Sequence, residues 1–192
     1  MPKVYRQVVS DRSITSSKSF NDFLYAWIVL HSEEENGERY IWKRDFVFSK
    51  LEAELGMTRK TAKNYFDNLV ELGLVADIED KWVLADLGVD GFKIEQHILE
   101  RLVSMKTRYA VSLYVYLVRG YYVAGQTQLV ILLDNVKDYL GLGKNTRSNN
   151  YIITDLFEDF RTMGLLNCVL NFDNKTVKQY YTLTGIGRKN YF

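Results

Sequence analysis

The chain has 192 residues, of which 14 are tyrosine and 10 phenylalanine, and its formal net charge is +1. This length suits one or two small domains, and the apolar content is sufficient for packed cores, which excludes a disordered protein. The single cysteine, Cys168, excludes an internal disulfide and a cysteine-based metal cluster. No signal peptide is visible, and apolar runs such as "AVSLYVYLV" are too short to span a membrane, so we expect a cytoplasmic protein without a membrane partner.

The first predicted element is a helix in "FNDFLYAWIVLHS", residues 20–32, for which Ser19 and Asp22 are candidate caps. Its apolar residues recur at helical spacing and define one buried face. The acidic segment "HSEEENGE" follows at residues 31–38. Its spacing does not match a calcium-binding loop, and we interpret it as a solvated connection. The residues expected on the buried face are Phe20, Phe23, Leu24, Trp27 and Ile28.

An internal repeat begins with "FVFSKLEAELG" at residues 46–56, because "ILLDNVKDYLG" at residues 131–141 aligns with it without a gap. Each copy is interpreted as a short apolar strand followed by a short amphipathic helix that ends in Leu-Gly. The predicted helix caps are Ser49, which forms a capping box with Glu52, and Asp134. The expected core positions, four residues apart, are Leu51 and Leu55 in one copy and Val136 and Leu140 in the other.

The repeat continues after an insertion in the second copy, where "TRKTAKNYFDNLVELGLV" (58–75) aligns with "NNYIITDLFEDFRTMGLL" (149–166). Both segments predict an amphipathic helix. Gly73 and Gly164 stand where such a helix ends in a left-handed residue. The residues expected to be buried are Ala62, Phe66, Leu69 and Leu72 in the first copy and Ile153, Phe157, Phe160 and Met163 in the second.

Two short strands joined by polar turn residues are predicted after each of these helices, at residues 74–85 and 166–184. Between the copies, "DLGVDG" at residues 86–91 has the composition of a domain boundary. Two further helices are predicted after it, one in "FKIEQHILERLVSM" and one in "RYAVSLYVYLVRG", the second of which Thr107 could cap.

The order of predicted elements is the same in both halves: helix, strand, short helix, second helix and β-hairpin. A short helix turned sharply into a longer one is a helix-turn-helix unit, and a hairpin packed after it is a wing. We therefore predict an α+β, mostly helical fold with tandem winged helix-turn-helix domains, at residues 1–88 and 89–192.

The second helix of the first copy begins with a cluster of cations. The helix dipole disfavours positive charge at that end, and a bound phosphate would favour it. In a helix-turn-helix this end meets base edges and phosphates, where Arg and Lys bind guanine, Asn binds adenine and Thr reaches phosphate. The alternative is an ordinary solvated helix face. The DNA-binding residues predicted here are Thr58, Arg59, Lys60, Thr61, Lys63 and Asn64, with Lys81 in the wing.

The second copy is less basic on the corresponding face, where Thr154, Asp155 and Glu158 point outward with Asn150 and Tyr151. Two carboxylates there would repel phosphate. Its inserted loop and its hairpin nevertheless hold polar and basic residues suited to gripping phosphate. The alternative is a dimerisation or packing role. The candidate DNA-binding residues of this domain are Lys144, Asn145, Arg147, Asn150, Tyr151, Lys175 and Lys178.

Enzymatic chemistry finds little support in the sequence. His31 and His97 are isolated in predicted helices, and Cys168 has no histidine near it in sequence. The Gly-x-Gly of "TGIGRK" lacks a third glycine and a helix-opening context, so it is a poor phosphate loop. We predict a protein that is not an enzyme and that has no metal and no cofactor.

The segment "ENGERYIWKRDFVFSKLEAELGMTRKTAKNYFDNLVELGLV" (35–75) resembles the N-terminal winged-helix domain of plasmid and phage replication initiators. The shared features are an "NG-x-x-Y" start, a strand, a Leu-Gly ending, a Lys-Thr-Ala helix and "ELGLV". The helix region "FKIEQHILERLVSMKTRYAVSLYVYL" (92–117) is similar in style to the helix that opens domains of those proteins. The resemblance implies binding of repeated origin sequences through Arg59, Lys60 and Lys63, with Asn64, and contact with the replication machinery.

The predicted function is sequence-specific binding of double-stranded DNA, as a replication initiator or origin-binding factor of a plasmid, phage or other mobile element. One alternative is a transcription regulator of the same architecture. The other is a winged-helix adaptor that binds protein and no DNA. Residues 1–90 hold 12 Lys and Arg against 16 Asp and Glu, which gives −4 and favours the adaptor, whereas residues 91–192 hold 13 against 8, which gives +5.

Overall fold

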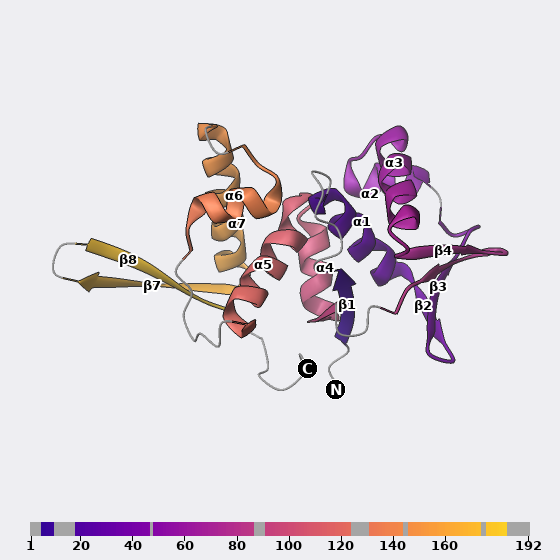
Figure 1. The fold of residues 1–192 in the computed structure, drawn as a ribbon, viewed down its shortest axis with the longest axis horizontal. Helices are drawn as coiled ribbons and strands as arrows, with labels where there is room; N and C mark the ends of the chain where they lie inside the picture. The colour runs from indigo at the N-terminus through magenta and orange to yellow at the C-terminus, as the bar shows by residue number, and fades with distance from the viewer. Residues whose placement is uncertain are drawn as a thin grey trace. The chain divides into compact units, whose positions relative to one another are not determined.

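The structure is a computed structural model that describes residues 5–9, 18–46, 48–86, 91–123, 131–143, 146–173 and 176–183. It is an α+β fold that is mostly helical, with seven helices and one four-stranded antiparallel sheet in that part of the chain (Figure 1). Contacts divide it into two compact units, and the division falls between Ser112 and Leu113, inside a helix.

The described helices are 8 to 16 residues long, and both helices and strands occur in consecutive runs along the chain. Among the described residues, the first unit contains six strands and the helices up to the start of α5, and the second contains the remaining elements. The elements are β1 (Tyr5–Val9), α1 (Lys18–His31), β2 (Glu33–Glu35), β3 (Glu38–Trp42), α2 (Phe48–Leu55), α3 (Arg59–Glu71), β4 (Val75–Ile78), β5 (Lys81–Leu84), β6 (Gly91–Glu95), α4 (Gln96–Ser104), α5 (Tyr109–Val123), α6 (Leu133–Leu140), α7 (Arg147–Thr162), β7 (Leu166–Asp173) and β8 (Thr176–Leu183).

Helix α1 is the central helix of the first unit and contacts α3, α4 and β1. Every side chain in residues 19–29 is buried except that of Phe20, which is half-buried. A helix that is covered on all sides is a core helix. The sequence analysis predicts only one buried face for it, whereas nearly all of its sides are buried. The predicted caps are also wrong: Ser19 and Asp22 lie within the helix, and Asp22 accepts a hydrogen bond from the Ser112 hydroxyl at 2.6 Å.

The four-stranded sheet has the order β2-β3-β5-β4 and is antiparallel throughout. Strands β2 and β3 are joined by Asn36 and Gly37, which both have positive φ, 53° and 82°. Two such residues form the tight turn that matches the twist of a hairpin. The acidic segment predicted as a solvated connection is therefore half of a hairpin. The predicted strand at residues 46–48 is wrong, because Phe46 follows the sheet and Phe48 begins α2.

Helices α2 and α3 are joined by three residues, of which Gly56 has φ 66°. Since α2 begins at Phe48, Ser49 lies inside it and the predicted capping box is wrong. The apolar spacing is confirmed, and Phe66 of α3 contacts the Phe46 and Trp82 rings, each with centroids 4.7 Å away. The buried residues of the two helices are Leu51, Leu55, Ala62, Phe66 and Leu69, whereas Leu72 is half-buried.

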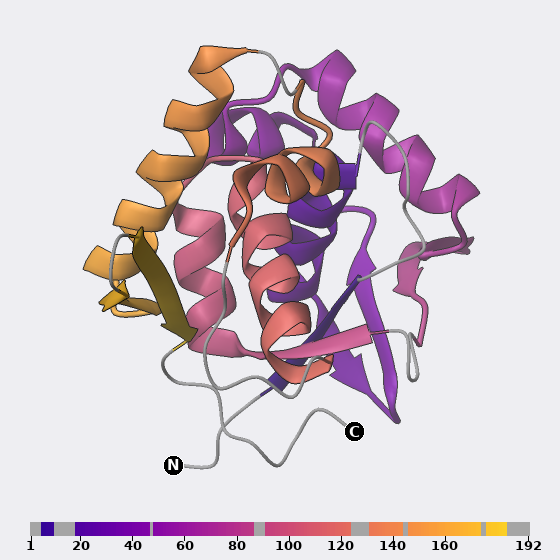
Figure 2. The ribbon, with the colours of Figure 1, turned by 60° about the vertical axis from the view of Figure 1, so that its left-hand side comes forward.

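Strand β1 pairs with β6 in a separate antiparallel ribbon, which Figure 2 shows together with α4. The sequence predicts one helix through residues 92–105, and this is wrong in its first part, because β6 ends and α4 begins between Glu95 and Gln96. Both β6 and α4 contact the elements of the first unit, β1 and α1. The contact-based division thus lies after α4, whereas the sequence places a domain boundary near residues 86–91, of which 87–90 lie outside the described residues.

The second unit repeats the element order of α2, α3 and the following hairpin. Helix α6 buries Val136 and Leu140, as predicted, but its first-turn Asp134 is not the cap; the cap residue is Leu132, which makes no side-chain hydrogen bond. Helix α7 follows the insertion and is packed on α6, and β7 pairs with β8 in an antiparallel hairpin. The buried residues of α7 are Ile153, Leu156, Phe157 and Phe160, whereas Met163 is half-buried.

Candidate nucleic-acid interface

The amino end of α3 is capped by Thr58, the residue that precedes the helix. Thr58 has extended backbone angles and its hydroxyl oxygen accepts a hydrogen bond from the Thr61 amide at 3.3 Å. The two threonine hydroxyls also lie 2.9 Å apart. A threonine at this position satisfies one of the amides that would otherwise be unpaired at the helix start. Thr58 is exposed and Thr61 is half-buried.

The face predicted to point outward does so, which confirms that part of the sequence analysis. Arg59 and Lys60 are exposed and have no ion pair or hydrogen bond to any residue of the described part of the chain. Lys63 is exposed but forms an ion pair with Asp67 at 2.9 Å, one helical turn later. Asn64 is exposed as well. Two uncompensated cations therefore stand at the end of a helix where the dipole disfavours them.

In the hairpin after α3, the predicted wing residue Lys81 is held by aromatic rings of the sheet. Lys81, predicted as a wing contact, is half-buried, and its ammonium lies 3.9 Å from the Tyr40 ring centroid and 4.5 Å from that of Trp42. Such cation–π contacts hold the lysine against the sheet. Burial and the carboxylates of Glu35 and Glu33 raise the pKa of Tyr40.

The tip of this hairpin is acidic. Glu79 and Asp80 form the turn and are exposed. Asp77 is exposed beside them and forms an ion pair with Lys43, whose ammonium also donates to the Glu79 carbonyl at 2.6 Å. Lys43 is a cation that the sequence analysis does not single out. Lys43 contacts hairpin residues that are distant from it in sequence, so no local pattern predicts the contact. The sequence around the hairpin shows only the run of acidic residues.

The predicted site residues of the second unit lie at the start of α7, in β8 and in segments outside the described residues. Arg147 is exposed in the first turn, with its guanidinium carbon 5.9 Å from the Tyr151 ring centroid. Tyr151 is 54% exposed. Asn150 is half-buried, and its amide oxygen has no hydrogen-bond partner in the described part of the chain. Lys144, Asn145 and Lys175 lie outside the described residues, and Lys178 lies in β8 with a side chain that the structure does not describe.

The exposed face of α7 is acidic. Asp155, Glu158 and Asp159 are all exposed. Arg161 donates to both oxygens of Glu158, at 3.1 and 2.6 Å, and these hydrogen bonds lower the pKa of that carboxyl group. The carboxylate is thus ionised at neutral pH. This face matches the prediction that acids point outward from the second copy.

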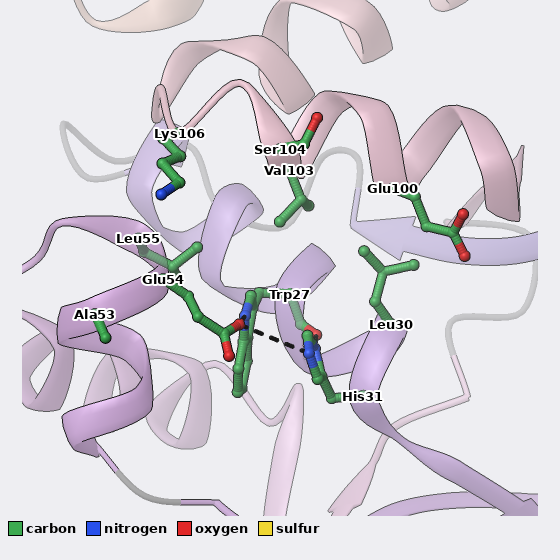
Figure 3. A pocket seen from close by; sticks show the side chains of 10 residues that line it. All are labelled: Trp27, Leu30, His31, Ala53, Glu54, Leu55, Glu100, Val103, Ser104 and Lys106. Atoms are coloured by element: carbon green, nitrogen blue, oxygen red, sulfur yellow. Dashed lines mark hydrogen bonds and ion pairs between the residues drawn. The ribbon is translucent and has the colours of Figure 1, made fainter.

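His31 is not isolated in space. It stacks on Trp27 with ring centroids 4.0 Å apart, and its Nδ1 lies 2.8 Å from the Trp27 carbonyl oxygen. The Trp27 indole donates to Glu54 at 2.7 Å, and Glu54 also lies 3.7 Å from His31 Nε2. These side chains line a cavity of about 490 Å³ whose other walls include Leu30, Leu55, Val103 and Lys106 (Figure 3). The group shows no nucleophile beside a base, and we assign it no chemistry.

No group of three or more His, Cys, Asp or Glu side chains that could hold a metal ion occurs among the described residues. None of the helices described is long and apolar enough to cross a membrane. Comparisons with protein-family models, with curated proteins and with solved structures found no match to the chain.

Proposed function

We propose that the chain is a sequence-specific double-stranded DNA-binding protein built from tandem winged-helix domains. In this proposal α2 and α3 are the helix-turn-helix of the first domain and β4–β5 is its wing. Helices α6 and α7, with the β7–β8 hairpin, are the corresponding parts of the second. The shared element order and the three-residue connection between α2 and α3 support it.

The observation that carries the proposal is the surface at the amino end of α3. Arg59 and Lys60 are exposed there without a carboxylate partner in the described part of the chain, at a helix end that already has partial positive charge. Phosphates and guanine acceptors supply the missing negative partner. A helix that presents this end to a groove binds DNA by the geometry typical of a recognition helix.

Each polar side chain on this face has a chemical role in the proposal. Arg59 and Lys60 donate to guanine O6 and N7, and Asn64 pairs with adenine through its amide. Thr58 and Thr61 bind phosphate through their hydroxyl groups. Lys63 shares its charge with Asp67 at 2.9 Å, so its contribution depends on release from that pair.

The biological role that fits best is a replication initiator or origin-binding factor of a plasmid, phage or other mobile element. Its support is the resemblance of residues 35–75 to initiator domains. A transcription regulator of the same architecture binds DNA in the same way, so the location of the bound sites, in origin repeats or in a promoter, distinguishes the two. The second domain supplies phosphate grip through its loop and hairpin cations or mediates dimerisation.

A second candidate function is that of an adaptor that binds protein and not DNA. The acidic tip of the first hairpin, at Glu79 and Asp80, and the acidic face of α7 favour it, because both would repel phosphate. The adaptor proposal predicts no salt-sensitive binding to any duplex.

Selection of bound fragments from a random-sequence duplex pool tests the proposed function. We expect a recovered motif, and binding to it that weakens steeply between about 50 and about 200 mM salt. A motif in two half-sites would also give their spacing and thus the symmetry of the bound protein. Recovery of no motif, together with salt-independent or undetectable binding, would overturn the proposal and favour the adaptor.

A further inference from the structure

A cluster of three side chains joins α3 to a cation far from it in sequence. The Tyr65 ring of α3 stacks on the Phe20 ring of α1, with centroids 4.3 Å apart and planes 12° apart. The guanidinium carbon of Arg108 lies 4.2 Å from the Phe20 ring centroid. All three side chains are half-buried. We call Tyr65, Phe20 and Arg108 the Phe20 cluster.

Arg108 is held in place without having its charge neutralised. Its guanidinium donates to the Tyr109 hydroxyl and lies 4.5 Å from that ring. No carboxylate lies within ion-pair distance of it in the described part of the chain. Stacking occupies the face of a guanidinium, whereas its five N–H donors lie in the plane, so most of them stay available to a ligand. A planar fork fixed in this way is suited to bidentate binding of phosphate.

The position of Tyr65 on α3 shows on which side of the exposed face of this helix the Phe20 cluster lies. Residues of an α-helix are about 100° apart around its axis. The exposed face of α3 is therefore bordered on one side by Phe66, which packs on Trp82 of the sheet, and on the other by Thr61 and Tyr65. Arg108 lies beyond this second border. Arg108 immediately precedes α5, and its link to α3 runs through the Phe20 and Tyr65 rings.

We infer that Arg108 is a phosphate-contacting residue that widens the DNA-binding face of α3. This inference rests on the proposed function. A helix in the major groove has a phosphate backbone along each of its two edges. The edge toward the hairpin meets an acidic tip and a lysine that is bound to aromatic rings. The opposite edge has Arg108, a preorganised cation with donors to spare, and it binds the backbone of the other strand.

Arg108→Gln and Arg101→Gln test this inference as a matched pair. Each removes one cation, and Arg101 is exposed in the last turn of α4 and takes no part in the ring contacts of the Phe20 cluster. Affinity is measured by fluorescence anisotropy on the full chain, with a random-sequence duplex and a selected duplex, each of about three helical turns, over a range of salt concentrations. We expect Arg108→Gln to weaken binding to both duplexes about tenfold and to flatten the salt slope by about one unit, and Arg101→Gln to change neither.

Two further variants separate the possible failures. Arg108→Lys keeps the charge but loses the planar fork, so we expect it to keep the salt slope and to lose part of the affinity. It also serves as the test should Arg108→Gln lower the melting temperature. Unchanged binding in both Arg108 variants, or an equal loss in Arg101→Gln, would overturn the inference alone, provided that Arg59→Ala with Lys60→Ala still weakens binding. Absence of salt-sensitive binding in the unaltered protein would overturn the proposed function itself.

Discussion

Helices α3 and α7 occupy the same place in two segments with the same element order, and they end in the same way. The Leu74 amide donates to the Leu69 carbonyl at 2.9 Å, and the Leu165 amide donates to the Phe160 carbonyl at 2.8 Å. Gly73 and Gly164, with φ 66° and 69°, supply the left-handed residue that this ending requires. The buried residues before them follow the same spacing.

Their exposed faces differ. The amino end of α3 is capped by Thr58 and presents Arg59 and Lys60, whereas Thr146 before α7 makes no side-chain cap. The face of α7 instead presents carboxylates such as Asp155. The spacing of the buried residues and the placement of the ending glycine are the same in both helices and maintain the scaffold. The exposed positions do not affect that scaffold, and they differ in charge. We therefore propose that the first unit, and not the second, reads bases.

The shared scaffold predicts the largest effects on stability. Phe66→Ala and Phe160→Ala should each lower the free energy of unfolding by about 3–5 kcal/mol, because each ring is buried in the core of its own unit. Urea unfolding followed by circular dichroism measures this. Val70→Ala is the control. Val70 lies on α3 with Phe66 but is 36% exposed, so its substitution should lower the free energy of unfolding much less. A loss for Phe160→Ala no greater than that of the control would break the equivalence of the two scaffolds.

The divergent faces predict the largest difference in DNA binding. Arg59→Ala with Lys60→Ala should abolish specific binding, since each base-reading side chain contributes about 1–3 kcal/mol of discrimination. Asp155→Ala with Glu158→Ala in α7 should leave affinity unchanged or raise it, because it removes charges that repel phosphate. Electrophoretic mobility shifts with a selected duplex measure both. Equal losses in the two double variants would remove the distinction between the units.

The two helix endings predict a smaller and equal effect. Gly73→Ala and Gly164→Ala should each cost about 1–2 kcal/mol, because a β-carbon disfavours the left-handed conformation. An added β-carbon would meet nothing within 4 Å at either glycine, so the cost is that of the backbone alone. Gly143→Ala is the control, since its neighbours allow ordinary contact at 3.6 Å. Thermal unfolding measures all three, and a neutral Gly164→Ala would argue against a common ending.

The smallest effect concerns pH. Hydrogen bonds from Arg161 lower the pKa of Glu158 from its ordinary value of 4.5. The lowered pKa stabilises the fold above pH 4.5, and this contribution is lost as the pH falls from there through the folded value. Carboxyl-carbon NMR titration should find Glu158 titrating below the other exposed glutamates, and Arg161→Gln should return it to their range. An unshifted Glu158 in the unaltered protein would contradict the ion pair.

Local patterns in the sequence predict the parts of this fold that depend on neighbours along the chain. The three- and four-residue spacing finds the buried faces of α3 and α7, and Leu-Gly finds their ends, because helix geometry is set within a few residues. The hairpin at Asn36 and Gly37 also has a local signal, but the acidic residues around it favoured a solvated connection. Here turn chemistry outweighs composition.

Features that depend on distant residues could not be predicted. Strands β1 and β6 pair although most of the sequence of the first unit lies between them, and no local pattern identifies the partner. Asp22 resembles a helix cap in sequence, yet it is buried because α5 brings Ser112 to it. Lys81 and Arg108 illustrate the same limit at the candidate site. Aromatic rings from other elements hold one against the sheet and place the other beside α3.

The most direct measurement is a map of amide chemical-shift changes on addition of a selected duplex to the isotope-labelled full chain. We predict the largest changes in residues 58–64, at the amino end of α3, with smaller ones at Arg108 and little change along the acidic face of α7. Saturated binding that leaves residues 58–64 unperturbed would contradict the account.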